Sequence, residues 1–227
     1  MHIPDGFLST GVAVTTAAVS AGVIGYSLYK SREELDEKSV PLLAVCAAFI
    51  FAAQMLNFPV AGGTSGHFLG GVLAAVLLGP WLGSLVIGLV LLVQCLGFAD
   101  GGLMALGANV FNMAVIGCVL GYFIFYGIKS VLPKKRTYFL AATGIAAWLS
   151  VFLASGVCAV ELAISGTSPL SVTLPAMLGV HSVIGVGEAL ITVVVVGLVL
   201  SVRPDIVRTY DYQPSIPEFE EAEVGQL

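Results

Sequence analysis

The stretch from His67 to Asp100, HFLGGVLAAVLLGPWLGSLVIGLVLLVQCLGFAD, contains neither lysine nor arginine and has a single acidic residue, at its end. A helix of about 20 residues crosses the roughly 30 Å hydrocarbon core of a bilayer, so the stretch is long enough for one tilted span or for two shorter ones. The Gly79-Pro80 pair divides it, and proline is favoured in the first turn of a helix. The sequence therefore predicts two helices here, over residues 67–79 and 81–97.

Long apolar tracts make up most of the remaining chain. Of the 227 residues, 58% are hydrophobic and 10% are charged, whereas soluble domains are about 25% charged. The tracts lack the alternation of a membrane barrel, and backbone groups in lipid must be satisfied internally, so helices are expected. The further predicted helices cover residues 7–29, 40–56, 103–128, 138–164 and 180–202. The predicted fold class is all-α, a polytopic membrane protein with seven transmembrane helices.

The basic residues orient the predicted helices. All nine lysines and arginines lie in three short stretches, Lys30–Lys38, Lys129–Arg136 and Arg203–Arg208. Cytoplasmic loops carry the excess of lysine and arginine, and all three stretches fall on one side if the chain crosses twice between residues 67 and 97. The N-terminus is then outside and the C-terminus is cytoplasmic.

Most of the acidic residues lie outside the apolar tracts. The net charge of −5 comes largely from the loop 33–37 and from the C-terminal segment, and it gives no support for nucleic-acid binding. Residues 209–227 are acidic, contain two prolines and few apolar residues, and are predicted to form a disordered cytoplasmic tail. Residues 1–208 are predicted to form one transmembrane domain.

Several sequence patterns of enzymes and of crosslinked proteins are missing. The chain has no GxxxxGK[ST] phosphate loop and no HExxH motif, so neither ATP hydrolysis nor zinc-dependent hydrolysis is predicted. The cysteines lie in apolar tracts without CxxC spacing, which favours buried small residues over disulfides or a zinc knuckle. These cysteines are Cys46, Cys95, Cys118 and Cys158.

The first apolar tract differs from a cleaved signal peptide. Its positive charges follow the apolar run, and the run is too long for the core of a typical signal. We therefore expect Met1 to remain in the mature chain, also because the large side chain of His2 hinders removal of the initiator methionine.

The three histidines, His2, His67 and His181, all fall at the outer end of the predicted bundle. His2 follows an α-amine whose ordinary pKa, about 7.7 to 8.0, allows partial deprotonation at neutral pH. The Met1 amine, the His2 amide nitrogen and His2 Nδ1 can close a five-membered and a six-membered chelate ring on a metal, nearly in one plane.

A second imidazole can complete that plane. His67 is the best candidate, because it ends the flexible stretch Gly62-Gly63-Thr64-Ser65-Gly66. Four planar nitrogen donors suit Ni(II) or Cu(II), whereas tetrahedral sites favour zinc. Other interpretations stay open: His2 as a solvated terminal residue, His67 as a backbone partner and His181 as a structural residue.

Further polar residues have two interpretations each. Asp5 and Asp100 either orient ligands and attract cations or are simply solvated. Intramembrane Glu161 and Glu188 normally point to a partner inside the bundle. Four more side chains near the outer half are placed to brace the N-terminal segment, namely Gln54, Asn57, Gln94 and Asn109.

The opening Met1-His2-Ile3-Pro4-Asp5-Gly6-Phe7-Leu8 and the loop Gly62–Gly70 resemble the CbiM/NikM family, the metal-binding S components of cobalt and nickel energy-coupling-factor transporters. The resemblance covers about residues 1–205. It implies the substrate-binding subunit of an ATP-driven importer for Ni(II), with Co(II) as the alternative, in the cell membrane of a prokaryote. It also implies that the Met1 amine, the His2 amide and imidazole, and the His67 imidazole bind the metal.

The same resemblance implies partners. They are a transmembrane coupling (T) component, two cytoplasmic ATPase subunits and, in many systems, a small accessory membrane subunit. S components of this kind dock through an alanine stripe, and two stripes are present, one with Ala44, Ala48 and Ala52 and one with Ala13, Ala17 and Ala21. Internal packing is the alternative for both.

Two other functional classes compete with this interpretation. In a proton-coupled secondary transporter, Glu161, Glu188 and His181 would relay protons. In an intramembrane metalloenzyme, the metal would need an open position for water, which four nitrogen donors in a closed plane do not leave.

Overall fold

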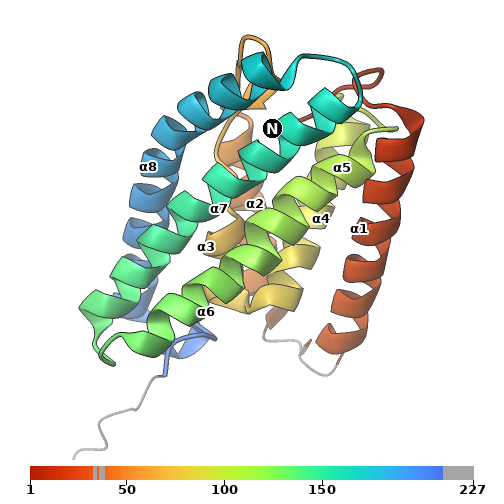
Figure 1. The fold of residues 1–227 in the computed structure, drawn as a ribbon. Helices are drawn as coiled ribbons and strands as arrows, with labels where there is room; N and C mark the ends of the chain where they lie inside the picture. Colours follow the sequence, from red (N-terminus) through yellow and green to blue (C-terminus); the bar gives the residue numbers. More distant parts are fainter. Residues whose placement is uncertain (33–34, 36–38, 212–227) are drawn as a thin grey trace, which may run out of the picture.

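The computed structural model describes residues 1–32, 35 and 39–211. Its helices form one bundle, in which α5, η1 and α6 follow one another as a single rod (Figure 1). In chain order the elements are α1 (Thr10–Ser31), α2 (Ser39–Gln54), β1 (Phe58–Pro59), β2 (Ser65–Gly66), α3 (Gly71–Leu78), α4 (Pro80–Phe98), α5 (Leu106–Val110), the π-helical η1 (Phe111–Leu120), α6 (Gly121–Val131), α7 (Arg136–Ile164), α8 (Leu170–Val202) and the 3₁₀ turn η2 (Pro204–Ile206).

The two ends of the bundle differ in chemistry. The N-terminus lies at the end that carries the α2–α3, α4–α5 and α7–α8 connections (Figure 1). The described lysines and arginines lie at the opposite end, in the last turn of α1 and just after it, from the last turn of α6 to the start of α7, and after α8. Five of the described helical rods are long and apolar enough to cross a membrane. The predicted all-α membrane class is confirmed.

Most predicted helices agree with the structure within a few residues, but the one over residues 67–79 is wrong in its extent. The structure has a helix over Gly71–Leu78 alone, and residues 67–70 run as an irregular segment before it. At 1.5 Å per residue, α3 is about 12 Å long and too short to cross a bilayer by itself. Every residue of α3 is buried. Its apolar sequence therefore reflects burial inside protein, which hydropathy cannot distinguish from contact with lipid.

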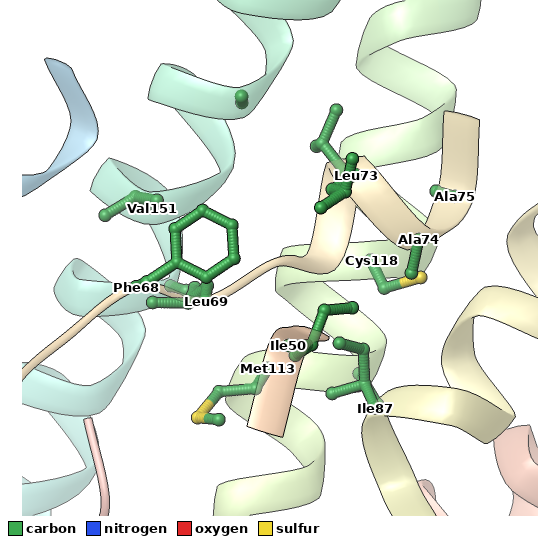
Figure 2. Packing of buried hydrophobic residues seen from close by; sticks show 14 of the residues in the cluster. Ile50, Phe68, Leu69, Leu73, Ala74, Ala75, Ile87, Met113, Cys118 and Val151 are labelled. Carbon is green, nitrogen blue, oxygen red and sulfur yellow. The ribbon is translucent and has the colours of Figure 1, made fainter. Parts of the chain in front are cut away.

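The centre of the bundle is built around α3. Figure 2 shows Phe68 and Leu69 on the segment that leads into α3, with side chains of the neighbouring helices around them. Gly71 lies against η1 so closely that a Cβ would come 2.6 Å from the Gly117 carbonyl. Gly79 then reverses the chain with a φ of 83°, and Pro80 begins α4. The Gly79-Pro80 break predicted from the sequence is thus where the chain turns back.

Both ends of α3 have partners from distant parts of the chain. At the start, the Glu188 carboxylate accepts hydrogen bonds from the Leu69 and Gly70 N–H groups, each 2.7 Å long. At the end, Thr209 Oγ1 donates to the Val76 carbonyl at 2.7 Å and the Arg208 N–H donates to the Leu77 carbonyl at 3.1 Å. Terminal backbone groups of a helix need such partners, above all where water is scarce. Because Thr209 belongs to the segment predicted as a tail, that segment begins as part of the fold, while residues 212–227 lie outside the described residues.

Helix α8 begins earlier than predicted. Residues 165–179 were expected to be a loop, yet α8 starts at Leu170 and contains Pro175 within its length. Serine, threonine and proline in this stretch weaken the local helical signal, but Thr173 and Met177 are buried in the bundle and tertiary packing overrides propensity. His181 consequently lies inside a helix and not at its start.

All four cysteines are free, as predicted. Cys46, Cys118 and Cys158 are buried, whereas Cys95 is partly exposed. They pack as small side chains among the helices.

Candidate metal centre

The first three residues fold back into the end of the bundle. Met1 and Ile3 are fully buried and His2 is 5% exposed. Asn109, on α5, accepts a hydrogen bond from the Ile3 N–H at 2.8 Å and returns one to the Ile3 carbonyl at 3.1 Å. The Gly102 N–H donates to the same carbonyl at 2.9 Å. The predicted bracing role of Asn109 is therefore realised through the backbone of Ile3.

Asp5 fixes the chain as it leaves the site. Its carboxylate accepts hydrogen bonds from the Leu103 and Met104 N–H groups, 3.1 and 2.8 Å long, in the turn before α5. The turn leaves no room beside it, because a Cβ on Gly102 would lie 2.2 Å from Asp5 Oδ1. Asp5 thus positions the N-terminal segment through backbone contacts and has no contact with His2 or His67 among the described interactions.

A short hairpin presents His67 from the other side. Strands β1 and β2 pair antiparallel, with Phe58 opposite Gly66, and the fully buried His67 follows directly. His67 Nδ1 lies 2.6 Å from the Phe68 carbonyl, which can only accept, so Nδ1 carries the hydrogen and Nε2 has a free lone pair. Gln54 donates to the Leu69 carbonyl at 2.6 Å and helps to hold this segment.

The two segments meet at their nitrogen atoms. The Met1 amine contacts His67 Nε2, although the residues are 66 positions apart. The His2 and His67 rings stack, with centroids 4.4 Å apart and 15° between their planes. The structure therefore brings Met1, His2 and His67 together. His181 lies beside this group, next to the Ser65 backbone, and its Nδ1 is hydrogen-bonded to the Met177 carbonyl at 2.8 Å.

The imidazole of His2 is held between Gln94 and Asp100. Nε2 lies 3.2 Å from Gln94 Oε1. Nδ1, which the six-membered chelate ring requires, lies 3.1 Å from Asp100 Oδ1. Asn57 donates to the other Asp100 oxygen at 3.2 Å. Asn57 and Gln94 thus act close to His2, as expected from the sequence.

Burial sets the charges of these groups. It lowers the pKa of the Met1 amine from 8.0 to about 5 and also lowers the pKa of His2. The neighbouring His2 side chain lowers the pKa of Asp100 below its ordinary value. At neutral pH the amine and the imidazole are therefore neutral, and a carboxylate stands beside them. This is the combination that attracts a cation and leaves lone pairs free to bind it.

Side chains alone do not make a metal site here. Among the residues that the structure describes, no group of three or more histidine, cysteine, aspartate and glutamate side chains is arranged to hold a metal. Two imidazoles and an amine with its neighbouring amide nitrogen remain, and such a nitrogen set favours nickel, copper or cobalt over magnesium or calcium.

Two contacts were not foreseen from the sequence. Ser65 Oγ accepts a hydrogen bond from the His2 N–H at 3.0 Å, and Glu188 anchors the backbone just after His67. As an intramembrane carboxylate, Glu188 is predicted to need a partner inside the bundle. Its partners are backbone N–H groups, and no sequence pattern identifies them. Glu161 accepts from Asn112 at 2.6 Å.

The fold and the site together define a class, a helical membrane protein whose chain start and one internal histidine meet at one end of the bundle. A family model described as the cobalt uptake substrate-specific transmembrane region matches residues 2–206, and the chain belongs to this family. It is a family of metal transporters and not of enzymes. The CbiM/NikM resemblance is thereby confirmed.

Relatives and solved structures agree with this assignment. A putative fused nickel transport protein of Archaeoglobus fulgidus is 44% identical over 209 residues, 91% of this chain and 68% of that protein. A putative metal transport protein of Haloquadratum walsbyi is 42% identical over 92% of this chain and 94% of its own. A crystal structure of a transition metal transporter has a TM-score of 0.83 at 34% identity, covering 92% of this chain and 96% of that chain.

Proposed function

We propose that this chain is the substrate-binding subunit of an ATP-driven importer for Ni(II) or Co(II), and that the start of the chain captures the metal. The observation that carries the proposal is the contact of the Met1 amine with His67 Nε2, beside a His2 ring whose Nδ1 faces the Asp100 carboxylate. Relatives named as nickel and as cobalt transport proteins support the choice of metals.

The proposed donors are the Met1 amine, the His2 amide nitrogen, His2 Nδ1 and His67 Nε2. The first three belong to the adjacent residues Met1 and His2, so they close chelate rings in a nearly planar arrangement. Nickel is the first choice, because a planar set of nitrogen ligands suits Ni(II), and Co(II) is the alternative.

The proposed membrane topology follows from the two ends of the bundle. The end with the described lysines and arginines faces the cytoplasm, and the end with Met1 faces outward. In this arrangement the chain passes seven times through the cell membrane of a prokaryote, and α3 is a short pass that is buried within protein. Metal then binds from the outside.

Transport needs partner subunits in this proposal. The chain supplies the site, a transmembrane coupling component and two cytoplasmic ATPases supply movement and energy, and a small accessory membrane subunit joins them in some systems. Ala44, Ala48 and Ala52 on α2 are all exposed, which supports α2 as the docking surface. On α1, Ala17 and Ala21 are exposed as well, but the helix packs closely against α5 there, because a Cβ on Gly107 would lie 2.5 Å from Ala17.

Docking is tested by Ala48→Trp, with Val194→Trp as the control because Val194 is also exposed but lies on α8. We expect the change at position 48 to abolish co-purification with the coupling component while nickel binding persists, and the change at position 194 to preserve both. Assembly that survives the bulky residue at 48 contradicts this docking surface.

The metal-binding proposal is tested by placing three alanines before Met1, because a single added residue would make His2 the third residue and create a new chelate of the amine, two amide nitrogens and the imidazole. The added residues convert the Met1 amine into an amide and move the free amine out of position. We expect nickel binding, measured by titration calorimetry and by the visible absorption of the metal, to be lost. The control carries the three extra alanines after Leu227 and binds normally. Unimpaired binding by the N-terminally extended protein would falsify the chelate.

A proton-coupled secondary transporter is the competing function. Both oxygens of Glu188 accept backbone hydrogen bonds, so the structure gives this residue a task other than proton relay. Uptake that collapses with an uncoupler and is indifferent to loss of the ATPases is the result that would favour this alternative.

A further inference from the structure

The hydrogen bond from the His2 N–H to Ser65 Oγ occupies the position at which a metal would bind the His2 amide nitrogen. An ionised amide nitrogen binds a metal in the peptide plane, along the direction that its hydrogen occupied. Metal–nitrogen bonds are about 2.0 Å long. Ser65 Oγ lies 3.0 Å from the same nitrogen in hydrogen-bonding geometry, so a metal on that nitrogen would be roughly 1 to 2 Å from the serine oxygen. The metal and this hydrogen bond therefore exclude each other.

We propose that the Ser65 hydroxyl is an internal competitor of the metal, which holds the His2 amide in its protonated form and is displaced when the metal binds. The inference rests on the proposed chelate. In the binding step the His2 N–H bond breaks, the nitrogen–metal bond forms, and the proton leaves to water. The hydrogen bond to Ser65 is lost in the same step.

The local structure allows this displacement without rearranging the site. Ser65 is partly exposed and lies on the two-residue strand β2, where its backbone pairs with Pro59. Rotation about its Cα–Cβ bond moves the hydroxyl to another staggered position while the strand stays in place. The His67 side chain, two residues on, is held separately through Nδ1 and the Phe68 carbonyl.

The neighbouring Thr64 provides a matched comparison. Successive side chains in an extended segment point to opposite faces, and the Thr64 hydroxyl lies 3.8 Å from Cys158 Sγ and not at the His2 amide. Loss of the Thr64 hydroxyl therefore tests the general effect of removing a polar group from this hairpin.

Displacement of Ser65 gives the site a means of release. When the metal leaves, the amide regains its hydrogen and Ser65 accepts it again, so the metal-free protein is stabilised by a bond that the metal-bound protein lacks. The hydroxyl then lowers the affinity of the site and favours handover. It also adds to the selection of the cargo, because only ions able to replace an amide hydrogen can displace the serine.

The experiment compares nickel binding to wild type, Ser65→Ala, Ser65→Thr and Thr64→Val in the purified full chain. Because a neutral hydrogen bond contributes modestly, Ser65→Ala is expected to bind nickel roughly two- to tenfold more tightly and to lose it more slowly. Ser65→Thr keeps a hydroxyl, and it and Thr64→Val should remain near wild type. Weaker or unchanged binding by Ser65→Ala overturns the proposal.

A second measurement separates displacement from direct ligation. X-ray absorption of the nickel-loaded wild type should show nitrogen donors, and Ser65→Ala should give the same set of ligands. If wild type shows an oxygen at bonding distance that is missing in Ser65→Ala, Ser65 is a ligand and the proposal is overturned. The protein with three alanines before Met1 serves as reference. Nickel binding by that protein rejects the chelate itself, whereas its failure to bind, together with an unchanged Ser65→Ala, rejects the serine competitor alone.

Discussion

The two segments that meet at the candidate metal centre, Met1–Asp5 and His67–Gly70, differ in burial and in how they are held. The first is buried only over its first three residues, and it is bound by Asn109 and by its own exposed Asp5. The second is buried throughout and is bound by Glu188 and Gln54. In the proposed chelate the first segment offers an amine, an amide nitrogen and an imidazole, whereas the second offers one imidazole.

This difference separates the tasks of the two segments. A chain end can supply several donors from adjacent residues, but only if its register is fixed, and the contacts of Ile3 and Asp5 serve that purpose. An internal segment supplies a single donor whose position depends on firm anchoring of the backbone around it. Changes in the first segment should therefore alter nickel binding, and changes in the anchor of the second should mainly alter stability.

The largest effect is expected for His67→Ala, which removes the contribution of the internal segment. Loss of residues that merely support a ligand lowers metal affinity about 10–100-fold, so loss of a donor should cost more than 100-fold. Titration calorimetry with nickel measures this. His181→Ala is the control, because His181 is also buried but lies outside the donor group; an equal loss in both variants would contradict the assignment.

Removal of the anchor by Glu188→Ala is expected to reduce stability. The Leu69 and Gly70 N–H groups lose their acceptor in the core, and each buried unsatisfied group costs about 1–3 kcal/mol. Thermal unfolding in detergent should show a clear decrease. Glu161→Ala is the comparison, since Glu161 bonds the Asn112 side chain and no backbone group. A decrease no larger than that of Glu161→Ala would argue against the capping role.

A smaller effect on binding is expected for Gly102→Ala. The added methyl group would overlap Asp5 and shift the N-terminal segment, so nickel affinity should fall about tenfold, as for residues that support a ligand, while thermal stability changes little. Gly97→Ala, where the methyl group meets nothing within 4 Å, is the matched control. Equal affinities of the two variants would show that the register of the first segment is not fixed at this turn.

The smallest and most specific prediction concerns protons. With the pKa of the Met1 amine lowered to about 5, the amine is already neutral at pH 7 and gives up no proton when the metal binds. The His2 amide then supplies one proton per nickel. Calorimetry in buffers of different ionisation enthalpy should report about one proton between pH 6.5 and 8 and an additional one below pH 5. Two protons at pH 7 would mean that the amine keeps its ordinary pKa.

The sequence predicts most of the helices and predicts that Met1, His2 and His67 lie together at one end of the bundle. Both predictions rest on single residues and short stretches of sequence. A long apolar tract predicts a helix, and the basic residues indicate which end of the bundle is cytoplasmic. The amine of Met1 beside His2 predicts a chelate. The comparison with relatives confirms the family that these residues indicate.

The sequence does not predict how α3 is made or what Ser65 and Glu188 contact. Hydropathy is the same for a helix surrounded by lipid and for one surrounded by protein. The sequence therefore predicts a longer helix, over residues 67–79, where the structure has the short, buried α3. Glu188 and Leu69 are joined across 119 positions, and Ser65 and His2 across 63. Such pairs depend on the packing of whole helices, which composition and spacing do not encode.

The paired hydrogen bonds between Asn109 and the Ile3 backbone are those that a neighbouring strand would make. They bind main-chain atoms, so they exclude proline at position 3, which has no N–H to give. They hold Ile3 two residues after Met1, and in the proposed chelate this spacing decides how far the amine reaches toward His67.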